Sequence, residues 1–192
     1  MAQPAPDPQR QLKHRRHIDV AVYARSDGLW EVEARLTDTK TRDVVLAGDV
    51  RRAGDPVHDM TLHLVVDTRF NILAAAARTD GMPYPGQCNA YGDAYGRLVG
   101  LNLLKGFRQA VKERLGGVQG CTHITEMTQV LPTAVIQAFA GEVLDTQEGA
   151  AGPSDQPPFQ IDRCHALRSD GQVVRQFYPR WYRPQEAEPA SP

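Results

Sequence analysis

The first third of the chain alternates apolar and polar positions, a pattern typical of β-strands with one buried face. Apolar residues recur at every second position from Ile18, and the alternation resumes after a turn at residues 26–28, where Gly28 tolerates a positive φ. In residues 29–36 an apolar face runs from Trp30 to Leu36, with charged residues on the other face. The pattern predicts a β-hairpin.

A second hairpin is predicted from residues 61–66 and 72–77, joined by a turn at residues 67–71. The alanine run that ends this segment is also compatible with helix, but the hairpin context favours a strand. Between the two hairpins, residues 38–56 are polar and predict a loop with a short strand at 44–46. Residues 80–86 contain two prolines and two glycines, which predicts a loop.

Helical spacing replaces the alternation after Cys88. The clearest predicted helix spans residues 104–115 and ends at Gly116. A second begins near Cys121 or Thr122, and Pro132 is expected to kink it or split it in two. Because strands precede helices, we predict an α+β fold, with an antiparallel sheet of four to six strands packed against two main helices. The predicted boundaries are a disordered arm at 1–12, a single domain at 13–183 and a disordered tail at 184–192.

Composition narrows the class of protein further. The chain has 192 residues, of which 41% are hydrophobic and 23% charged, with a net charge of −1. These values fit one globular domain and give no basic excess for nucleic acid binding. The N-terminus lacks the apolar segment of a secretory signal, and no run is long enough to span a membrane. Three cysteines without framework spacing favour reduced thiols and a cytoplasmic location.

The three cysteines provide the main chemical clue, because two of them lie beside histidines. Cys121 is followed by His123, Cys164 is followed by His165, and Cys88 stands apart. Thiolate and imidazole ligands are typical of zinc sites, although no Cys-x-x-Cys or His-Glu-x-x-His motif is present. The same residues could supply a thiolate and a proton shuttle, or the cysteines could be core residues.

Acid–base chemistry is the other possibility. A helix beginning at Cys121 would favour its thiolate, and His123 and Glu126 share one helix face at i, i+3 spacing. That pair could be a base with its orienting carboxylate, two metal ligands, or an exposed polar face. His58 is a further acid–base candidate beside Asp59, just before a predicted strand, where adjacent residues point to opposite faces.

Aromatic and arginine residues around the loop after the sheet are candidates for substrate binding. Aromatic side chains could line a pocket, and an arginine would suit a ligand carboxylate, although ordinary packing and surface charge explain these residues equally well. Phosphate-binding glycine loops and a Gly-x-Ser-x-Gly elbow are absent, which disfavours nucleotide-dependent enzymes and common serine hydrolases. The candidate substrate-binding residues are Trp30, Tyr84, Tyr91, Arg97 and Arg108.

Five blocks of sequence resemble a bacterial family catalogued as domain of unknown function 2889. They are residues 27–30, 36–40, 56–60 and 114–123, and the block 164–167 taken together with 178–182. The resemblance extends from about His14 to Arg183. It implies that the Cys-Thr-His and Cys-His blocks are signature elements that belong to one site. Members occur in bacteria that degrade aromatic and other recalcitrant carbon compounds.

From these features we expect a small catabolic enzyme that acts on an aromatic or hydrophobic carboxylated metabolite. A lyase step is expected, either decarboxylation or loss of a small aldehyde, with histidine and carboxylate acid–base chemistry and no organic cofactor. The alternatives are a non-enzymatic zinc- or ligand-binding protein or an accessory subunit, and a homodimer is plausible. The candidate metal ligands are Cys88, Cys121, His123, Cys164 and His165.

Overall fold

The computed structural model describes residues 3–47, 49–147 and 156–184. The chain divides into two compact units, residues 1–136 and 137–192. Residues 3–12 of the predicted arm are exposed and lie outside any strand or helix, whereas residues 1–2 and all of the predicted tail except Arg183 and Pro184 lie outside the described residues. The predicted single domain over residues 13–183 stays a prediction.

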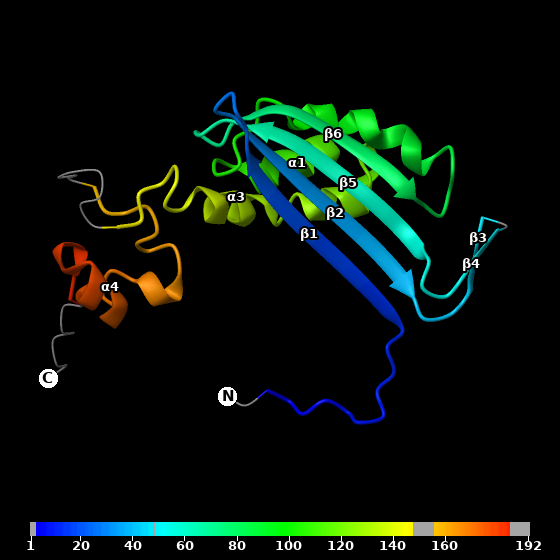
Figure 1. The fold of residues 1–192 in the computed structure, drawn as a ribbon, viewed down its shortest axis with the longest axis horizontal. Helices are drawn as coiled ribbons and strands as arrows, with labels where there is room; N and C mark the ends of the chain where they lie inside the picture. Colours follow the sequence, from blue (N-terminus) through cyan, green and yellow to red (C-terminus); the bar gives the residue numbers. More distant parts are fainter. Residues whose placement is uncertain (1–2, 48, 148–155, 185–192) are drawn as a thin grey trace, which may run out of the picture. The chain divides into compact units, whose positions relative to one another are not determined.

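The first unit is built on a four-stranded antiparallel sheet in the order β1-β2-β5-β6 (Figure 1). A separate two-stranded sheet pairs β3 with β4. The predicted α+β class, both hairpins and the short strand at residues 44–46 are therefore confirmed. The strands are β1 (His14–Ala24), β2 (Trp30–Lys40), β3 (Val44–Leu46), β4 (Asp49–Arg51), β5 (Pro56–Val66) and β6 (Ile72–Gly81).

The two faces of the sheet follow the alternation in the sequence. On β2, Val32, Ala34 and Leu36 are fully buried, whereas the intervening Glu33 and Arg35 are exposed. Gly28 has φ 79° in the turn before this strand, a conformation that glycine adopts without strain. Burial of one apolar face by helices is the main source of stability for such a sheet.

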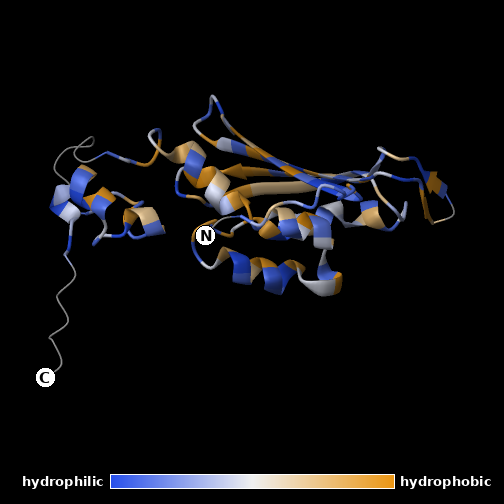
Figure 2. Ribbon diagram, turned by 90° about the horizontal axis from the view of Figure 1, so that it is seen from below, coloured by the Kyte–Doolittle hydropathy of each residue, from blue (hydrophilic) through white to orange (hydrophobic). Residues whose placement is uncertain are grey.

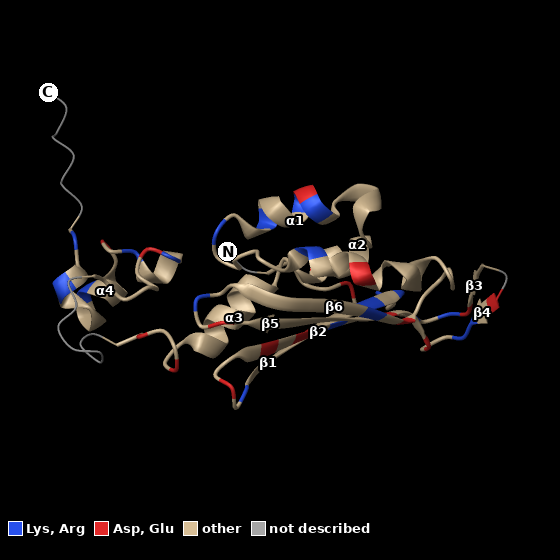
Figure 3. Cartoon of the chain, turned by 90° about the horizontal axis from the view of Figure 1, so that it is seen from above, with Lys and Arg blue, Asp and Glu red and all other residues tan. Residues whose placement is uncertain are grey.

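Helices of the first unit lie on one side of the sheet, as the edge-on views in Figures 2 and 3 show. Phe107, Val111 and Leu115 of α1 and Ile124 and Met127 of α2 are buried there. The helical segments of this unit are η1 (Cys88–Leu98), α1 (Phe107–Leu115), η2 (Gly117–Gln119), α2 (Thr122–Met127) and α3 (Leu131–Phe139), the last of which continues into the second unit.

Several predicted boundaries differ from the observed ones. β5 begins at Pro56, so His58 lies inside a strand and not before it. β6 continues to Gly81 into the predicted loop, because that strand pairs with β5 along its length. α1 begins at Phe107, three residues later than predicted, after a left-handed Gly106. The predicted split at Pro132 is confirmed, since α2 and α3 are separate helices there.

In the part of the second unit that the structure describes, short helical segments lie between His165 and Trp181. The amide of Gln160 donates to the carbonyl of Thr146 and to the hydroxyl of Tyr178, and Val174 is fully buried. Among the described residues, none of the helices is sufficiently long and apolar to cross a membrane. The helical segments of this unit are η3 (His165–Leu167), α4 (Gln172–Phe177) and η4 (Pro179–Trp181).

Asp67 organises the turn between β5 and β6. Its carboxylate accepts hydrogen bonds from the backbone amides of Arg69 and Asn71 and from the side-chain amide of Asn71, each at 2.9 Å. Burial raises the pKa of Asp67, but these hydrogen bonds outweigh burial and hold the pKa below its usual range. The turn is therefore stabilised by the ionised carboxylate.

We expect Asp67→Asn to lower the free energy of unfolding by about 1 kcal/mol at neutral pH, since one charge-assisted acceptor is lost. A depressed folded-state pKa contributes stability above the unfolded value of about 3.9 and loses it as the pH falls through the folded value. The difference between wild type and variant should therefore shrink below about pH 4. Urea unfolding as a function of pH measures it, and a constant difference would contradict this role.

Candidate functional site

Three neighbouring strands place Arg16, Asp38 and His58 side by side at one end of the sheet. Arg16 of β1 is the register partner of Asp38 on β2, and Asp38 is the partner of His58 on β5. A register shift follows Asp38, between Asp38 and Thr39. Such irregularities re-aim side chains at the end of a ladder. Since Leu36 faces the helices, Asp38 faces them too, two residues further along the strand.

The carboxylate of Asp38 is shared by several cationic or hydrogen-bonding side chains. Arg16 binds it in a bidentate manner, with Nε 2.9 Å from Oδ1 and Nη2 2.7 Å from Oδ2. Nδ1 of His58 lies 2.9 Å from Oδ2, and Nε2 of His14 lies 3.2 Å from Oδ1. Asp38 is only 2% exposed, so these partners replace the water that a buried charge loses.

The surroundings of Asp38 keep it ionised. Burial raises its pKa, but the hydrogen bonds from Arg16 and His58 and the charge of Arg16 outweigh burial and lower the pKa to about 2. A carboxylate can only accept a hydrogen bond, so a neutral His58 must carry its proton on Nδ1. The lone pair on Nε2 of His58 is then free to accept a proton or bind another group.

Helix α2 brings a second imidazole to this point. The ring of His123 lies against that of His58, with centroids 3.9 Å apart and planes tilted by 33°. One potential ligand atom from each of Asp38, His58 and His123 lies within 4.8 Å of the others. We call Arg16, Asp38, His58 and His123 the Asp38 cluster.

Arg16 also ties α2 to the sheet. Its Nη1 forms a hydrogen-bonded ion pair with the carboxylate of Glu126, while its other nitrogens remain on Asp38. The side chain of Arg16 is 31% exposed, and that of Glu126 is 46% exposed. Glu126, which the sequence predicts as a partner of His123, therefore acts on the cluster through Arg16.

Cys121 caps the first turn of α2 beside the cluster. Its Sγ lies 3.8 Å from Nδ1 of His123 and 3.9 Å from Sδ of Met60. Burial raises the pKa of the Cys121 thiol. The imidazole of His123 and the backbone amides of Ile124 and His123 outweigh it, so the pKa lies below its ordinary value. The thiol is therefore more readily ionised than a free cysteine, as the sequence predicts.

A buried tyrosine fixes the start of α2. The hydroxyl of Tyr95, a residue with no exposed surface, accepts from the Cys121 amide at 3.0 Å and donates to the Cys121 carbonyl at 2.8 Å. Thr125 Oγ1 lies 2.9 Å from the same hydroxyl. A Cβ on Gly120 would lie 2.7 Å from the Leu115 carbonyl and 3.2 Å from the Tyr95 hydroxyl, so glycine is required there.

The structure brings four of the predicted residues to one place: His58, Cys121, His123 and Glu126. Cys88 begins η1 and is partly buried, and exposed Cys164 and His165 lie in the second unit. The part of the predicted zinc site that includes these three residues stays a prediction.

The predicted substrate-binding residues are spread over several elements. Trp30 is eight residues from Asp38 on β2, or about 26 Å along the strand, so it lies away from the cluster. Arg97 donates to the carbonyls of Arg114 and Gln119, which gives it a structural role. Tyr84 and Tyr91 are exposed.

Arg108 lies in a more suggestive position. It lines a hollow of about 400 Å³ between α1 and α2, together with Lys112 and Thr125. Two cationic side chains at one hollow favour an anionic ligand. Arg108 is thus the predicted anion-binding residue that the structure places beside the helix carrying His123.

Sequence reasoning did not identify Asp38, Arg16 and His14 as site residues. Asp38 falls at the start of a segment predicted as a loop, and Arg16 and His14 precede Ile18, where the predicted alternation begins. A signal was nonetheless present. The alternation that turns Leu36 inward also turns Asp38 inward, and an acidic residue at a buried position requires partners.

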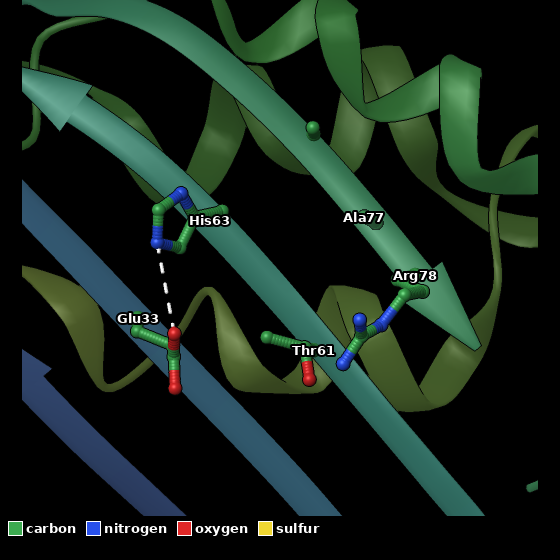
Figure 4. A pocket seen from close by; sticks show the side chains of 6 residues that line it. Glu33, Thr61, His63, Ala77 and Arg78 are labelled. Atoms are coloured by element: carbon green, nitrogen blue, oxygen red, sulfur yellow. Dashed lines mark ion pairs between the residues drawn. The ribbon is translucent and has the colours of Figure 1, made fainter. Parts of the chain in front are cut away.

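His63 lies on the opposite face of the sheet, as the alternation predicts. Its Nε2 is 3.7 Å from a carboxylate oxygen of Glu33, and both line a hollow of about 310 Å³ with Thr61 and Arg78 (Figure 4). Both partners of the His63–Glu33 pair are close to half exposed. His63 therefore serves below as a histidine control outside the cluster.

Fold and site define an α+β protein with an inward-facing carboxylate–histidine cluster where the sheet meets helix α2. The chain belongs to the family described as protein of unknown function (DUF2889), whose family model matches residues 14–137. The matched region begins at His14, where the sequence resemblance was expected to begin. It ends at residue 137, close to the boundary of the first unit, so the Cys164–His165 block lies outside it. No curated protein and no solved structure is significantly similar to the chain.

Proposed function

We propose that the chain is a lyase that acts on a carboxylated aromatic or hydrophobic metabolite, with His58 and His123 transferring protons. The observation that supports this proposal is the hydrogen bond from Nδ1 of His58 to the buried carboxylate of Asp38. A carboxylate that fixes the tautomer of a histidine leaves Nε2 as a positioned base. The adjacent ring of His123 supplies a second proton carrier.

Two proton carriers match the requirements of carbon–carbon cleavage. For loss of a small aldehyde, Nε2 of His58 takes the proton of a substrate hydroxyl, and the bond between its carbon and the neighbouring carbon breaks. The electron pair stays on the neighbouring carbon, where an adjacent aromatic ring stabilises it, and a proton from His123 neutralises it. In decarboxylation, carbon dioxide leaves and the same protonation completes the reaction. No organic cofactor takes part in the proposed reaction.

Cationic side chains near α2 suit the carboxylate of such a substrate. Arg108 and Lys112 line the hollow that also includes Thr125 of α2. An arginine can bind a carboxylate through two parallel hydrogen bonds. A cytoplasmic location and a homodimer belong to the same proposal.

A panel of carboxylated aromatic compounds with a hydroxymethyl side chain tests the reaction, with release of aldehyde or carbon dioxide as the readout. We expect His58→Gln and His123→Ala each to lower kcat/KM by about 10²-fold to 10⁴-fold, the usual contribution of a general acid or base. His63→Ala is the matched control and should leave turnover unchanged. Full turnover in His123→Ala would remove that residue from the mechanism, and no turnover of any compound by the wild type would contradict the proposal.

A further inference from the structure

The Asp38 cluster also has the composition and spacing of a metal site. Two histidines and one carboxylate are a ligand set that proteins use for divalent iron and other first-row transition metals. One ligand atom from each of Asp38, His58 and His123 lies within 4.8 Å of the others. Two atoms bound at about 2.1 Å to one ion, at right angles, lie about 3 Å apart. The 2.9 Å between Oδ2 of Asp38 and Nδ1 of His58 matches that value, and binding through Nδ1 requires the proton of neutral His58 to move to Nε2.

The charges around the cluster favour a cation. Asp38 and Glu126 each carry a negative charge, and Arg16 carries one positive charge between them. With neutral imidazoles these three side chains have a net charge of −1. A bound divalent ion would bring the net charge of the site to +1. The imidazole of His14 also lies beside Asp38, and Met60 and the Cys121 thiol are nearby soft sulfur groups that transition ions tolerate.

Arg16 already binds the carboxylate that such an ion would need. Its guanidinium occupies both oxygens of Asp38, at 2.9 Å and 2.7 Å, while a third nitrogen pairs with Glu126. A guanidinium and a metal ion compete for the same carboxylate lone pairs. Because Arg16 is paired with Glu126 as well, it can leave Asp38 and still keep an anionic partner.

We propose that Asp38, His58 and His123 bind one divalent transition metal ion, and that the ion displaces Arg16 from Asp38 toward Glu126. This inference goes beyond the proposed reaction, since it concerns binding in the absence of substrate. An ion bound at Nδ1 of His58 leaves Nε2 protonated, so the base that the proposed reaction requires is lost. Where both proposals hold, zinc inhibits the lyase.

The test is a titration of the chelator-treated full chain with Zn²⁺ by calorimetry and with Co²⁺ by visible absorption. We expect one ion per chain, with affinity lowered at least about a hundredfold in His58→Gln, His123→Gln and Asp38→Asn. His63→Gln and Cys164→Ser are matched controls that should bind as the wild type does. Unchanged affinity in the two cluster histidine variants, or loss of binding in Cys164→Ser alone, would overturn the proposal.

Arg16→Gln should change the affinity for the ion in the opposite direction. Removing the competing guanidinium should raise the affinity about tenfold, since a hydrogen bond to a charged group no longer has to be broken. A variant that merely damages the fold would bind more weakly, so the sign separates competition from damage. Glu126→Gln should lower the affinity, because Arg16 then keeps only Asp38. Weaker binding by folded Arg16→Gln, verified by circular dichroism, would overturn the displacement of Arg16.

Discussion

Replacing Asp38 by asparagine is expected to lower the free energy of unfolding by about 2 to 4 kcal/mol. The substitution removes the negative partner of a buried ion pair and leaves the charge of Arg16 in place. The NH₂ of asparagine must take the place of Oδ1 or of Oδ2, and Arg16 donates to both oxygens, with His58 also donating to Oδ2. In either orientation a donor then faces a donor beside a residue that is only 2% exposed. Urea unfolding at pH 7 measures the loss.

Asp59 provides the matched control for Asp38. It is also a strand carboxylate bound by an arginine in a bidentate manner, at 2.8 Å and 2.7 Å from Arg35, but it faces away from the helices. The side chain of Arg35 is 57% exposed, so we expect Asp59→Asn to cost about 1 kcal/mol or less. Equal losses in the two variants would show that the burial of Asp38 carries no extra stabilisation.

Asp38→Asn should also change the nuclear magnetic resonance spectrum of His58. In the wild type the carboxylate selects the tautomer of His58 with the proton on Nδ1. Asparagine removes that selection, so the proton should shift in part to Nε2. Nitrogen chemical shifts of the imidazole measure the tautomer directly, and an unchanged tautomer in Asp38→Asn would contradict the orienting role.

Replacing Tyr95 by phenylalanine is the second large effect we expect, at about 2 to 3 kcal/mol of unfolding free energy. Phenylalanine fills nearly the same volume, so packing is preserved while the hydroxyl is lost. The amide of Cys121 then loses its acceptor, whereas the carbonyl of Cys121 still accepts from the amide of Thr125 at 2.9 Å. A partly buried polar group without a partner costs most of its hydration energy.

Tyr91→Phe is the control for Tyr95. The hydroxyl of Tyr91 donates to the carbonyl of Val118 at 2.9 Å, but Tyr91 is 40% exposed and water can replace it. We expect a loss below about 1 kcal/mol, since this bond has solvent as an alternative. Chemical denaturation of both variants under one set of conditions gives the comparison, and a loss in Tyr95→Phe no larger than in Tyr91→Phe would contradict the role of the buried hydroxyl.

Local patterns predicted the elements of this fold well. Alternation in residues 29–36 identified β2 and its buried face, and Pro132 identified the break between α2 and α3. These features depend on neighbours in the sequence, and a pattern of period two or a proline reports them directly. The same holds for Cys121 and His123, which are two residues apart at the start of one helix.

The rest of the cluster depends on strand pairing. Arg16 and His58 meet Asp38 because β1 and β5 flank β2 in one particular register, and a slip of one residue would turn these side chains to the other face. The polar composition of residues 38–56 predicted a loop, so Asp38 was assigned to that loop and not to a strand. A polar residue at an inward position was the one local indication of its role.

The ion pair between Arg16 and Glu126 joins residues 110 positions apart in the chain. Contacts of such separation form late, because the entropy of closing a long loop must be overcome first. During synthesis the sheet strands emerge well before α2, so Asp38 first meets Arg16 and His58 without His123. In the nascent chain the imidazoles of His14 and His58 therefore face the carboxylate before that of His123 arrives, and the proton transfer and metal binding that we propose would have to wait until α2 has been made and docked.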